Sequence, residues 1–237
     1  METRLLLAEL HAHTTWSDGV LSLTALVDLY GSHGFDVLCV TDHALPSDGG
    51  NRSHVGVHNW RAYLDAVDEE AERALERYGL LVIPGVELTD DHDDPLRSAH
   101  ALALGLRRFV TVDLGLRYAV DEARHAGAAI VAAHPHRPGE NRRATCRWWH
   151  ERDAPTIRAD RYELFNRLDV FSWIAERDLP PVASGDFHRL EHLNTWKTLL
   201  PCPKDERAVI EFLCSDRRAY LAPFPVGLRP VAERAAA

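Results

Sequence analysis

The chain has 237 residues, of which 46% are hydrophobic and 27% charged, and its formal net charge is −9. This length suits a single domain, residues 1–237, with a substantial core, and the composition is ordinary for a globular protein. Because modules that bind nucleic acids usually carry a basic surplus, the acidic balance disfavours a nucleic-acid partner.

Neither a leader nor a membrane segment is expected. The first residues, METRLLLAELHAH, contain only a short apolar run, which we interpret as a strand rather than a signal peptide. No apolar stretch reaches the roughly 18–20 residues that a membrane span needs. The four cysteines form no CxxC pair and no disulfide-like spacing, so a reducing, cytoplasmic location is the default expectation. The oligomeric state is left open.

Apolar runs of strand length alternate with segments of helical spacing along the chain. The repeated strand–helix units predict an α/β fold with a parallel sheet and helices outside it. Residues 137–160 are less regular and fit either a helix plus a loop or a flap over a site. The expected strands lie at about Leu5–Leu10, Asp36–Val40, Leu80–Val86, His100–Leu106, Ala128–Ala133, Tyr162–Phe165 and Pro181–Ala183, and the expected helices at Leu21–Gly34, Trp60–Tyr78, Val112–Ala126 and Lys204–Arg218.

Residues that bind metals recur at the ends of these predicted strands. In parallel α/β folds the C-terminal ends of the strands share one face, so side chains far apart in the sequence converge there. Each motif is weak alone: a pair such as HAH is as often incidental, and SDG is a common turn. The placement at six strand ends together favours a metal cluster. The residues are His11 and His13, Asp42 and His43, Glu87, His100, His134 and His136, and Asp186 and His188.

The ligand types indicate which ions such a cluster would hold. Histidines mixed with carboxylates, without cysteine, suit Zn, Mn or Fe. There are more ligands than one tetrahedral ion needs, so two or three ions are implied, with Glu87 as the candidate bridge. Such a cluster lowers the pKa of bound water and binds a phosphoryl or carbonyl oxygen. A metal-dependent hydrolase is therefore the expected class of protein.

The six motifs ELHAHTTWSDG, VTDH, PGVEL, AHALALGL, AAHPHR and SGDFH resemble those of the PHP (polymerase and histidinol phosphatase) family. They occur in the same order over about Leu7–Arg189, whereas the C-terminal helix and tail, 204–237, carry no motif. The resemblance implies a distorted (β/α)7 TIM-like barrel of the PHP type. It also implies a trinuclear metal centre and a stand-alone enzyme that hydrolyses phosphoesters through a metal-bridging hydroxide.

The resemblance further implies how three divalent ions would be shared. One ion would be held by His11, His13, Glu87 and Asp186. A second would be held by Glu87, the bridge, with His100 and His134, and the third by Asp18, His43 and His188. Some relatives have His where Asp18 stands, and this carboxylate slightly favours Mn or Fe over Zn.

The roles in the reaction are expectations of the same kind. Glu87 and Asp186 would act through the bridging hydroxide. Arg137 is the first candidate for phosphate contact because arginine suits the charge on the phosphoryl oxygens. His136 and Arg189 are weaker candidates for contact with the substrate. The general acid stays unassigned.

The short distance between two motifs favours a small substrate, and several functions stay open. Glu87 and His100 are separated only by a short acidic loop, which favours a small phosphorylated metabolite or nucleotide, as a monoester, cyclic ester or diester. A nuclease acting on nucleic-acid ends is one alternative, and a non-catalytic metal-binding domain is another. A metal amidohydrolase needs a bridging lysine, which neither Lys197 nor Lys204 supplies by position. The nuclease would use a surface of Arg142, Arg143, Arg147, Trp148 and Trp149.

Overall fold

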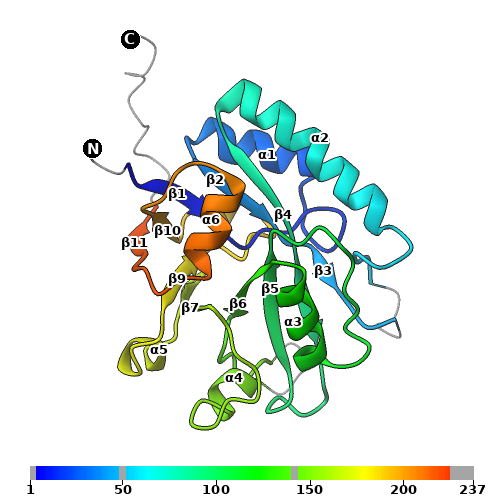
Figure 1. The fold of residues 1–237 in the computed structure, drawn as a ribbon, viewed down its shortest axis with the longest axis vertical. Helices are drawn as coiled ribbons and strands as arrows, with labels where there is room; N and C mark the ends of the chain where they lie inside the picture. Colours follow the sequence, from blue (N-terminus) through cyan, green and yellow to red (C-terminus); the bar gives the residue numbers. More distant parts are fainter. Residues whose placement is uncertain (1–3, 48–51, 140–143, 225–237) are drawn as a thin grey trace.

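The computed structural model describes residues 4–47, 52–139 and 144–224 (Figure 1). Its strands form one mixed sheet in the order β11-β10-β1-β2-β4-β5-β6-β7-β8, with β3 paired to β4 and β9 paired to β7. The strands are β1 Leu6–Glu9, β2 Val37–Val40, β3 His43–Ala44, β4 Leu81–Asp90, β5 Ala99–Leu104, β6 Ala129–Ala133, β7 Arg161–Asn166, β8 Asp169–Val170, β9 Pro181–Ser184, β10 Trp196–Leu200 and β11 Tyr220–Pro223. The helices are α1 Leu23–Ser32, α2 Trp60–Tyr78, α3 Leu116–His125, α4 Arg147–His150, α5 Trp173–Glu176 and α6 Glu206–Leu213, with a 3-10 turn at Leu190–Leu193.

The sheet curls so that β9, the last parallel strand, lies next to β1, the first. Beyond β1 and β9, Ala12 and Phe187 form a parallel bridge. The His13 N–H donates to the Phe187 carbonyl at 2.9 Å, and the Phe187 N–H donates to the His11 carbonyl at 3.0 Å. The ring of strands therefore runs β1-β2-β4-β5-β6-β7-β9, and each expected apolar run supplies one of its strands. The mixed α/β fold of a distorted barrel is confirmed.

The expectation of a wholly parallel sheet is wrong at β5. This strand pairs antiparallel with both β4 and β6. The connection from β4, residues 91–98, contains no helix, and a parallel crossover needs a dozen or more residues. A regular count of seven β/α units is therefore not confirmed. Because β5 runs backwards, its first residues lie where the parallel strands end, and His100 is paired with Thr89 and Ala133.

The four expected helices exist, and all but α2 are shorter than predicted. α1 begins after Ser22, whose hydroxyl accepts from the Ala25 N–H, and α2 ends at Gly79 in a left-handed conformation (φ 62°). The helix expected at Val112–Ala126 begins only at Leu116, and that expected at Lys204–Arg218 begins at Glu206 after an Asp205 cap. The last part of the predicted C-terminal segment, 225–237, lies outside the described residues.

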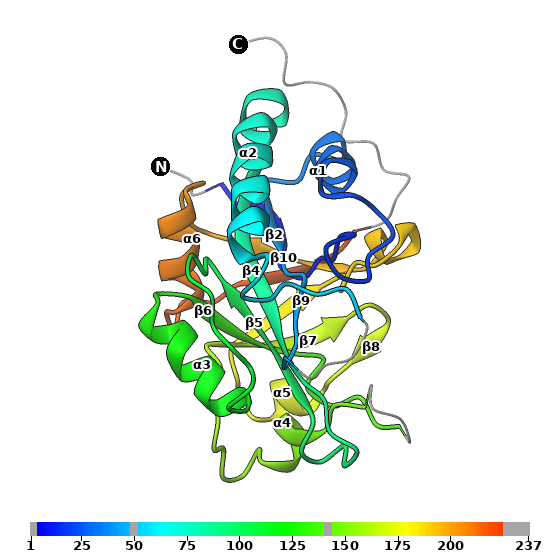
Figure 2. The same ribbon diagram turned by 90° about the vertical axis from the view of Figure 1, so that its right-hand side faces the viewer.

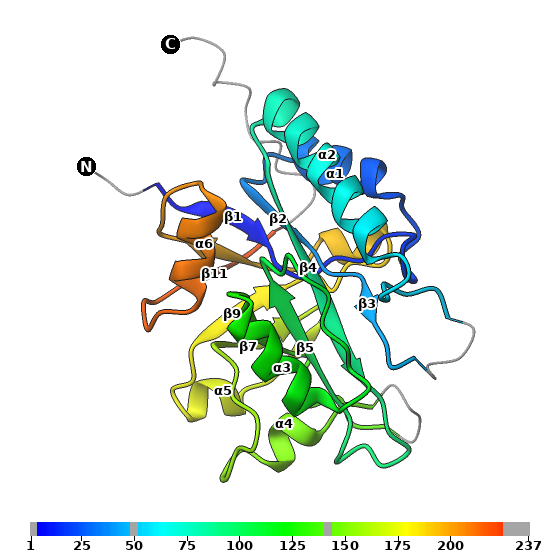
Figure 3. The ribbon, with the colours of Figure 1, turned by 45° about the vertical axis from the view of Figure 1, so that its right-hand side comes forward.

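Helices cover the outside of the barrel and close one end of it. α1 and α2 lie side by side (Figures 1 and 3), and α2 packs along β4 (Figure 2). Inside the ring, aliphatic side chains of the strands pack against Val209, Phe212 and Leu213 of α6. The buried guanidinium of Arg161, at the start of β7, donates to carbonyls at the end of α6. α6 thus closes the end where the parallel strands begin and leaves the other end for the polar residues.

Two smaller features complete the fold. In the irregular region, residues 144–160 form the short helix α4 with flanking loops, and 140–143 lie outside the described residues. β10 and β11, which the sequence did not suggest, extend the sheet beyond β1 by antiparallel pairing. Among the described helices, none has both the length and the apolar character needed to cross a bilayer.

Candidate metal centre

The nine side chains predicted to bind metal converge at the end of the barrel opposite α6. Six of them are buried, whereas His43 and His188 are partly exposed and Asp18 is exposed. They form compact groups in which the potential ligand atoms all lie within 4.8 Å of one another. The groups are His11, His13 and Glu87; His11, His134 and Asp186; Glu87, His100 and His134; and His13, Asp18, His43 and His188.

The first predicted ion would lie between β1, β4 and the loop after β9. The Nε2 atoms of His11 and His13 are 3.0 Å apart. They lie 3.5 and 3.4 Å from Glu87 Oε2, and each lies 3.6 Å from Asp186 Oδ1. Ligand atoms about 2.1 Å from a tetrahedral ion would be separated by roughly 3.4 Å. The distances from the two imidazoles to each carboxylate therefore suit a shared cation, while Glu87 and Asp186 fall in different groups.

The ligands predicted for the second and third ions also lie close to one another. Glu87 Oε1 lies 3.0 Å from His100 Nδ1 and 2.9 Å from His134 Nε2. Asp18 Oδ1 lies 3.5 Å from His43 Nε2 and 3.0 Å from His188 Nε2. The Glu87 carboxylate thus faces the first set with one oxygen and the second with the other, as a bridging ligand would.

The backbone is strained where two of these ligands leave their strands. His134, directly after β6, has φ 27°, and Asp186, two residues after β9, has φ 43°. Arg167, which contacts Asp186, has φ 52°. Non-glycine residues rarely adopt positive φ, and such strain concentrates at functional sites. These strained conformations lower the stability of the fold, but they orient the side chains of His134 and Asp186 into the cluster.

The electrostatics of the cluster match a cation site. Burial alone would raise the pKa of Glu87, but His43, His11 and His100 hold it well below its usual value. The pKa of Asp186 is likewise lowered, against its burial, by His11 and His188. Glu87 Oε2 is fully buried and accepts no hydrogen bond from the described residues, although His43 Nδ1 lies 2.9 Å away. A buried carboxylate oxygen without a donor is costly, and a divalent cation would satisfy it.

Comparison with solved structures identifies the architecture. A two-domain protein from Bacteroides vulgatus, described as containing a predicted PHP-like metal-dependent phosphoesterase, superposes with a TM-score of 0.64 at 20% identity over 92% of this chain. The chain spans only 64% of the length of that protein. The chain has the PHP-type fold. No known family and no curated protein matched the sequence directly.

Two further solved structures share the fold of this chain. PsfC from Pseudomonas syringae gives a TM-score of 0.58 at 16% identity, with 93% of this chain and 92% of that one covered. An amidohydrolase from Chromobacterium violaceum, solved with bound sulfate and no metal, gives 0.52 at 17% identity, with 76% and 87% covered. At these identities the likeness concerns the fold alone.

Two carboxylates behind the cluster, Glu163 and Asp91, were missed by the sequence analysis. Glu163, within β7, accepts from His11 Nδ1 at 2.9 Å and from the His134 N–H at 2.6 Å. Asp91 lies 2.8 Å from His100 Nε2. Carboxylates in such positions fix the orientation of ligand imidazoles. Asp42, predicted only as part of the strand-end set, instead accepts from Thr14 and Ser17 and braces the SDG turn.

The candidates for substrate contact are placed differently from one another. Arg137 Nη2 lies 3.6 Å from Asp186 Oδ2, at the rim of the cluster, and His136 is half-buried beside it. Arg189 is exposed and its side chain pairs with Glu191, so the structure does not bring it to the cluster. Arg167, which was not predicted, lies 3.0 Å from Asp186 Oδ1 and 2.9 Å from His188 Nδ1.

The surface considered for a nuclease is only partly present. Trp148 is buried, and its indole N–H donates to the His100 carbonyl at 2.9 Å, so it belongs to the core. Trp149 stacks on His136 at a centroid distance of 4.5 Å. Arg142 and Arg143 lie outside the described residues. Of the two tryptophans, only Trp149 is placed to meet a ligand.

Proposed function

We propose that the protein is a metal-dependent hydrolase of the PHP family that cleaves phosphoesters of small molecules. The observation that carries the proposal is the convergence of nine His, Asp and Glu side chains around Glu87, whose buried carboxylate faces two ligand sets. We propose three divalent ions, Mn, Zn or Fe, with the ligands divided as the family resemblance implies. When bound, such ions supply an activated water and neutralise charge on the phosphoryl oxygens.

Glu87, Asp186 and Arg137 would position the metal ions and the substrate. Glu87 would hold two ions at a fixed separation because its two oxygens face different histidines. Asp186 lies between His11 and the arginines Arg137 and Arg167. Arg137, at the rim, would donate to a phosphoryl oxygen in the bidentate manner for which a guanidinium is suited. The acidic balance of the chain makes such local positive charge necessary for an anionic substrate.

A small substrate is supported by the connections around the site. The connection from β4 to β5, which separates Glu87 from His100, has only eight residues (91–98) and adds no substrate domain.

Lys197, considered for an amidohydrolase, is buried and bound to Glu9 at 2.6 Å and to Thr195 at 2.7 Å. It is therefore committed to another partner and does not serve as a metal-bridging lysine.

A panel of phosphomonoesters, cyclic phosphates and diesters, assayed with the Mn-loaded protein, tests the proposal. We expect turnover of at least one small phosphoester and its loss in Asp186→Ala and His13→Ala, with the fold retained by circular dichroism. His125→Ala, at an exposed helix end, is the matched control and should retain activity. Turnover of amides alone, or of oligonucleotides but no mononucleotide, would favour the alternatives. Wild-type activity in Asp186→Ala would contradict the proposed site.

A further inference from the structure

His134 leaves β6 in a strained conformation, and the direction of its imidazole depends on hydrogen bonds to other segments. Its φ of 27° lies in a region that residues with a Cβ seldom adopt, so the strand alone does not fix where the ring points. The His134 N–H donates to Glu163 at 2.6 Å. The carbonyl and the ring both contact one further side chain, the hydroxyl of Thr145.

The Thr145 hydroxyl determines which nitrogen of the His134 ring carries the proton. It donates to the His134 carbonyl at 2.9 Å, and its oxygen lies 3.1 Å from Nδ1 of the ring. Because a hydroxyl has only one proton, and that proton is given to the carbonyl, Oγ1 can only accept at Nδ1. Nδ1 then carries the ring proton, and Nε2 presents its lone pair toward Glu87 Oε1, 2.9 Å away. A ring that binds a cation through Nε2 must have this form.

Backbone pairing holds Thr145 in this place. The Arg137 N–H donates to the Thr145 carbonyl at 2.8 Å, and the Thr145 N–H donates to the Arg137 carbonyl at 2.9 Å. The next residue, Cys146, donates to the Pro95 carbonyl at 3.0 Å in the connection from β4 to β5. Thr145 itself is completely buried. The predicted ligand His134 is thus tied to the segment that carries the rim arginine.

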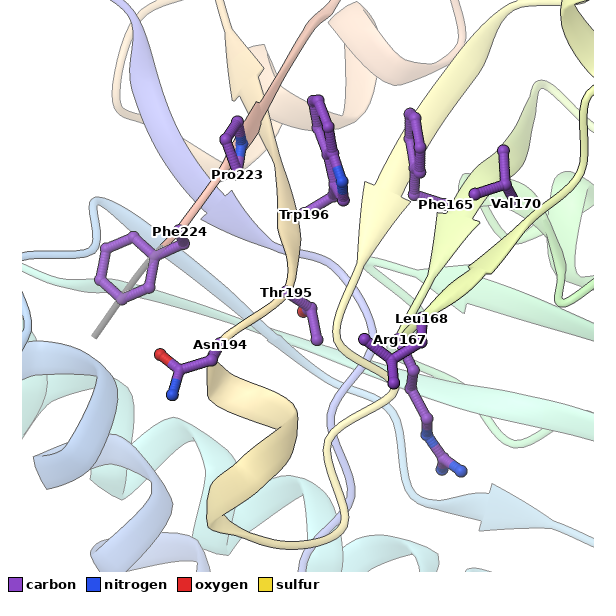
Figure 4. A pocket seen from close by; sticks show the side chains of 9 residues that line it. All are labelled: Phe165, Arg167, Leu168, Val170, Asn194, Thr195, Trp196, Pro223 and Phe224. Carbon is purple, nitrogen blue, oxygen red and sulfur yellow. The ribbon is translucent and has the colours of Figure 1, made fainter. Parts of the chain in front are cut away.

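Thr145 lines neither of two cavities that adjoin the metal centre through an arginine. One cavity, of about 560 Å³, is lined in part by Arg137, and the other, of about 440 Å³, in part by Arg167 (Figure 4). Both arginines also lie close to Asp186, at 3.6 and 3.0 Å. A loss of activity in a Thr145 variant would therefore not come from a lost contact with a substrate in either cavity.

We propose that Thr145 is a positioning residue for the ion assigned to Glu87, His100 and His134. Its hydroxyl keeps the proton of His134 on Nδ1 and leaves Nε2 free to bind the ion. The inference rests on the proposed function, and it adds a residue that no motif of the family resemblance contains. Without the hydroxyl, the proton would move to Nε2, where the Glu87 carboxylate accepts it, and the ring would offer no lone pair to the ion.

Two variants of Thr145 separate the hydroxyl from the shape of the side chain. Thr145→Val keeps the branched shape and loses the hydroxyl, whereas Thr145→Ser keeps the hydroxyl. We expect Thr145→Val to weaken the binding of one Mn ion roughly 10- to 100-fold in competition with a chelator, the usual effect of losing the partner of a ligand imidazole. Thr145→Ser should bind as the wild type does. Wild-type affinity in Thr145→Val would overturn the inference.

Thr198→Val is the matched control. Thr198 is equally buried, and its hydroxyl also joins a carbonyl to an N–H: it donates to the Ala183 carbonyl at 2.8 Å and accepts from the Ala183 N–H at 2.9 Å. Both valine variants lose the same kinds of hydrogen bond, so urea unfolding should show similar destabilisation. Only Thr145→Val should lose Mn affinity. An equal loss of affinity in both would assign the effect to the fold and contradict the positioning role.

The position of the ring proton can be observed directly. NMR of isotope-labelled ring nitrogens in the metal-free protein distinguishes a His134 ring protonated at Nδ1 from one protonated at Nε2. We expect the proton on Nδ1 in the wild type and in Thr145→Ser, and on Nε2 in Thr145→Val. The same form of the ring in the wild type and in Thr145→Val would contradict the inference.

The dependence of turnover on Mn concentration separates this inference from the proposed function. At saturating Mn, Thr145→Val should recover the wild-type kcat for a phosphoester with an unchanged KM, because a weakened site can still be filled by mass action. A loss that persists at saturating Mn would contradict a role limited to positioning. If no phosphoester is hydrolysed, the proposed function fails, whereas a Thr145-dependent ion affinity and ring proton would still support this inference.

Discussion

The Nδ1 atom of His11 lies 2.9 Å from the Glu163 carboxylate, and both side chains are completely buried. Burial would raise the pKa of Glu163, but His11 and His134 hold it below its usual value. An ionised Glu163 accepts a hydrogen bond from the Nδ1–H of His11, so Nε2 of His11 is turned toward Glu87 and Asp186. Glu163 therefore acts as a positioning residue for the cluster.

Glu163→Gln should weaken metal binding about 10- to 100-fold, the usual effect of losing such an outer carboxylate. Four donors converge on Glu163, and an amide has only one acceptor oxygen for them. The measurement is competition with a chelator of known affinity. The four donors are His11 Nδ1, the His134 N–H, Ser184 Oγ and Asn166 Nδ2.

Glu9→Gln is the matched control for Glu163→Gln. Glu9 is equally buried, but it binds Lys197, Tyr30 and the backbone N–H groups of His11 and Gly185 rather than a ligand imidazole. Its loss leaves the buried Lys197 charge unpaired and should lower the free energy of unfolding by about 3 kcal/mol. We expect a smaller change in metal affinity than for Glu163→Gln. Equal loss of affinity in both variants would contradict the positioning role.

His100 should hold a proton in the metal-free protein at neutral pH. Burial lowers its pKa, but Glu87 and Asp91, one beside each ring nitrogen, raise it to about 9 from 6.5. Its contribution to the stability of the metal-free fold is complete below pH 6.5 and is lost as the pH rises through 9. Metal ions must displace this proton, so metal affinity should increase as the pH rises and level off above about 9.

Titration of the His100 ring by NMR in the metal-free protein checks this pKa. Asp91→Asn removes one of the two carboxylates and should lower the pKa of His100. It should also shift the rise in metal affinity to lower pH. A His100 pKa near 6.5 in the wild type, or no response to Asp91→Asn, would show that the two carboxylates do not act on the ring as the structure indicates.

Arg137→Met should lower kcat/KM for phosphoesters by roughly 10- to 100-fold, since a hydrogen bond to a charged group contributes about 1.5–3 kcal/mol. The metal content should stay at the wild-type value because Arg137 is not a predicted ligand. Arg108→Met, which removes an exposed arginine paired with Glu122, is the control and should be neutral. Loss of bound metal in Arg137→Met would assign the arginine to the support of Asp186 instead of the substrate.

Gly19→Ala tests the turn that carries Asp18. A Cβ at this position would lie 2.3 Å from the His13 carbonyl oxygen and 2.7 Å from the Thr14 nitrogen. The segment after β1 would have to move, and we expect a loss of about 1–3 kcal/mol in unfolding free energy together with weaker metal binding. Gly79→Ala meets no neighbouring atom but has φ 62°, so it should cost about 1–2 kcal/mol and leave metal binding unchanged. Urea unfolding and chelator competition separate the two effects.

The sequence predicted the strands and the ligands because both follow from local patterns. Apolar runs identify strands, and residues at the ends of parallel strands meet at one face. His100 was included although it stands at the beginning of its strand, where the argument from the ends of parallel strands does not apply. Only the antiparallel direction of β5 brings that beginning to the face where Glu87 and His134 lie.

The residues that the sequence did not reveal act through tertiary contacts. Glu163 stands within β7, where a charged side chain has no marker except its place among the nonpolar residues of YELF. Arg167 reaches Asp186 across the pairing of β7 with β9. Arg189 illustrates the opposite case, because it follows a motif directly and yet its side chain pairs with Glu191 at the surface.

Counting the bound metal tests the central claim most directly. The protein is loaded with Mn, freed of excess ions by gel filtration and measured by plasma mass spectrometry against protein concentration. We expect about three ions per chain, as the family resemblance implies, and fewer in Asp186→Ala and His13→Ala. A metal content no higher than in a double Asp186→Ala, His13→Ala variant would contradict the account, because the convergence around Glu87 would then have a purely structural origin.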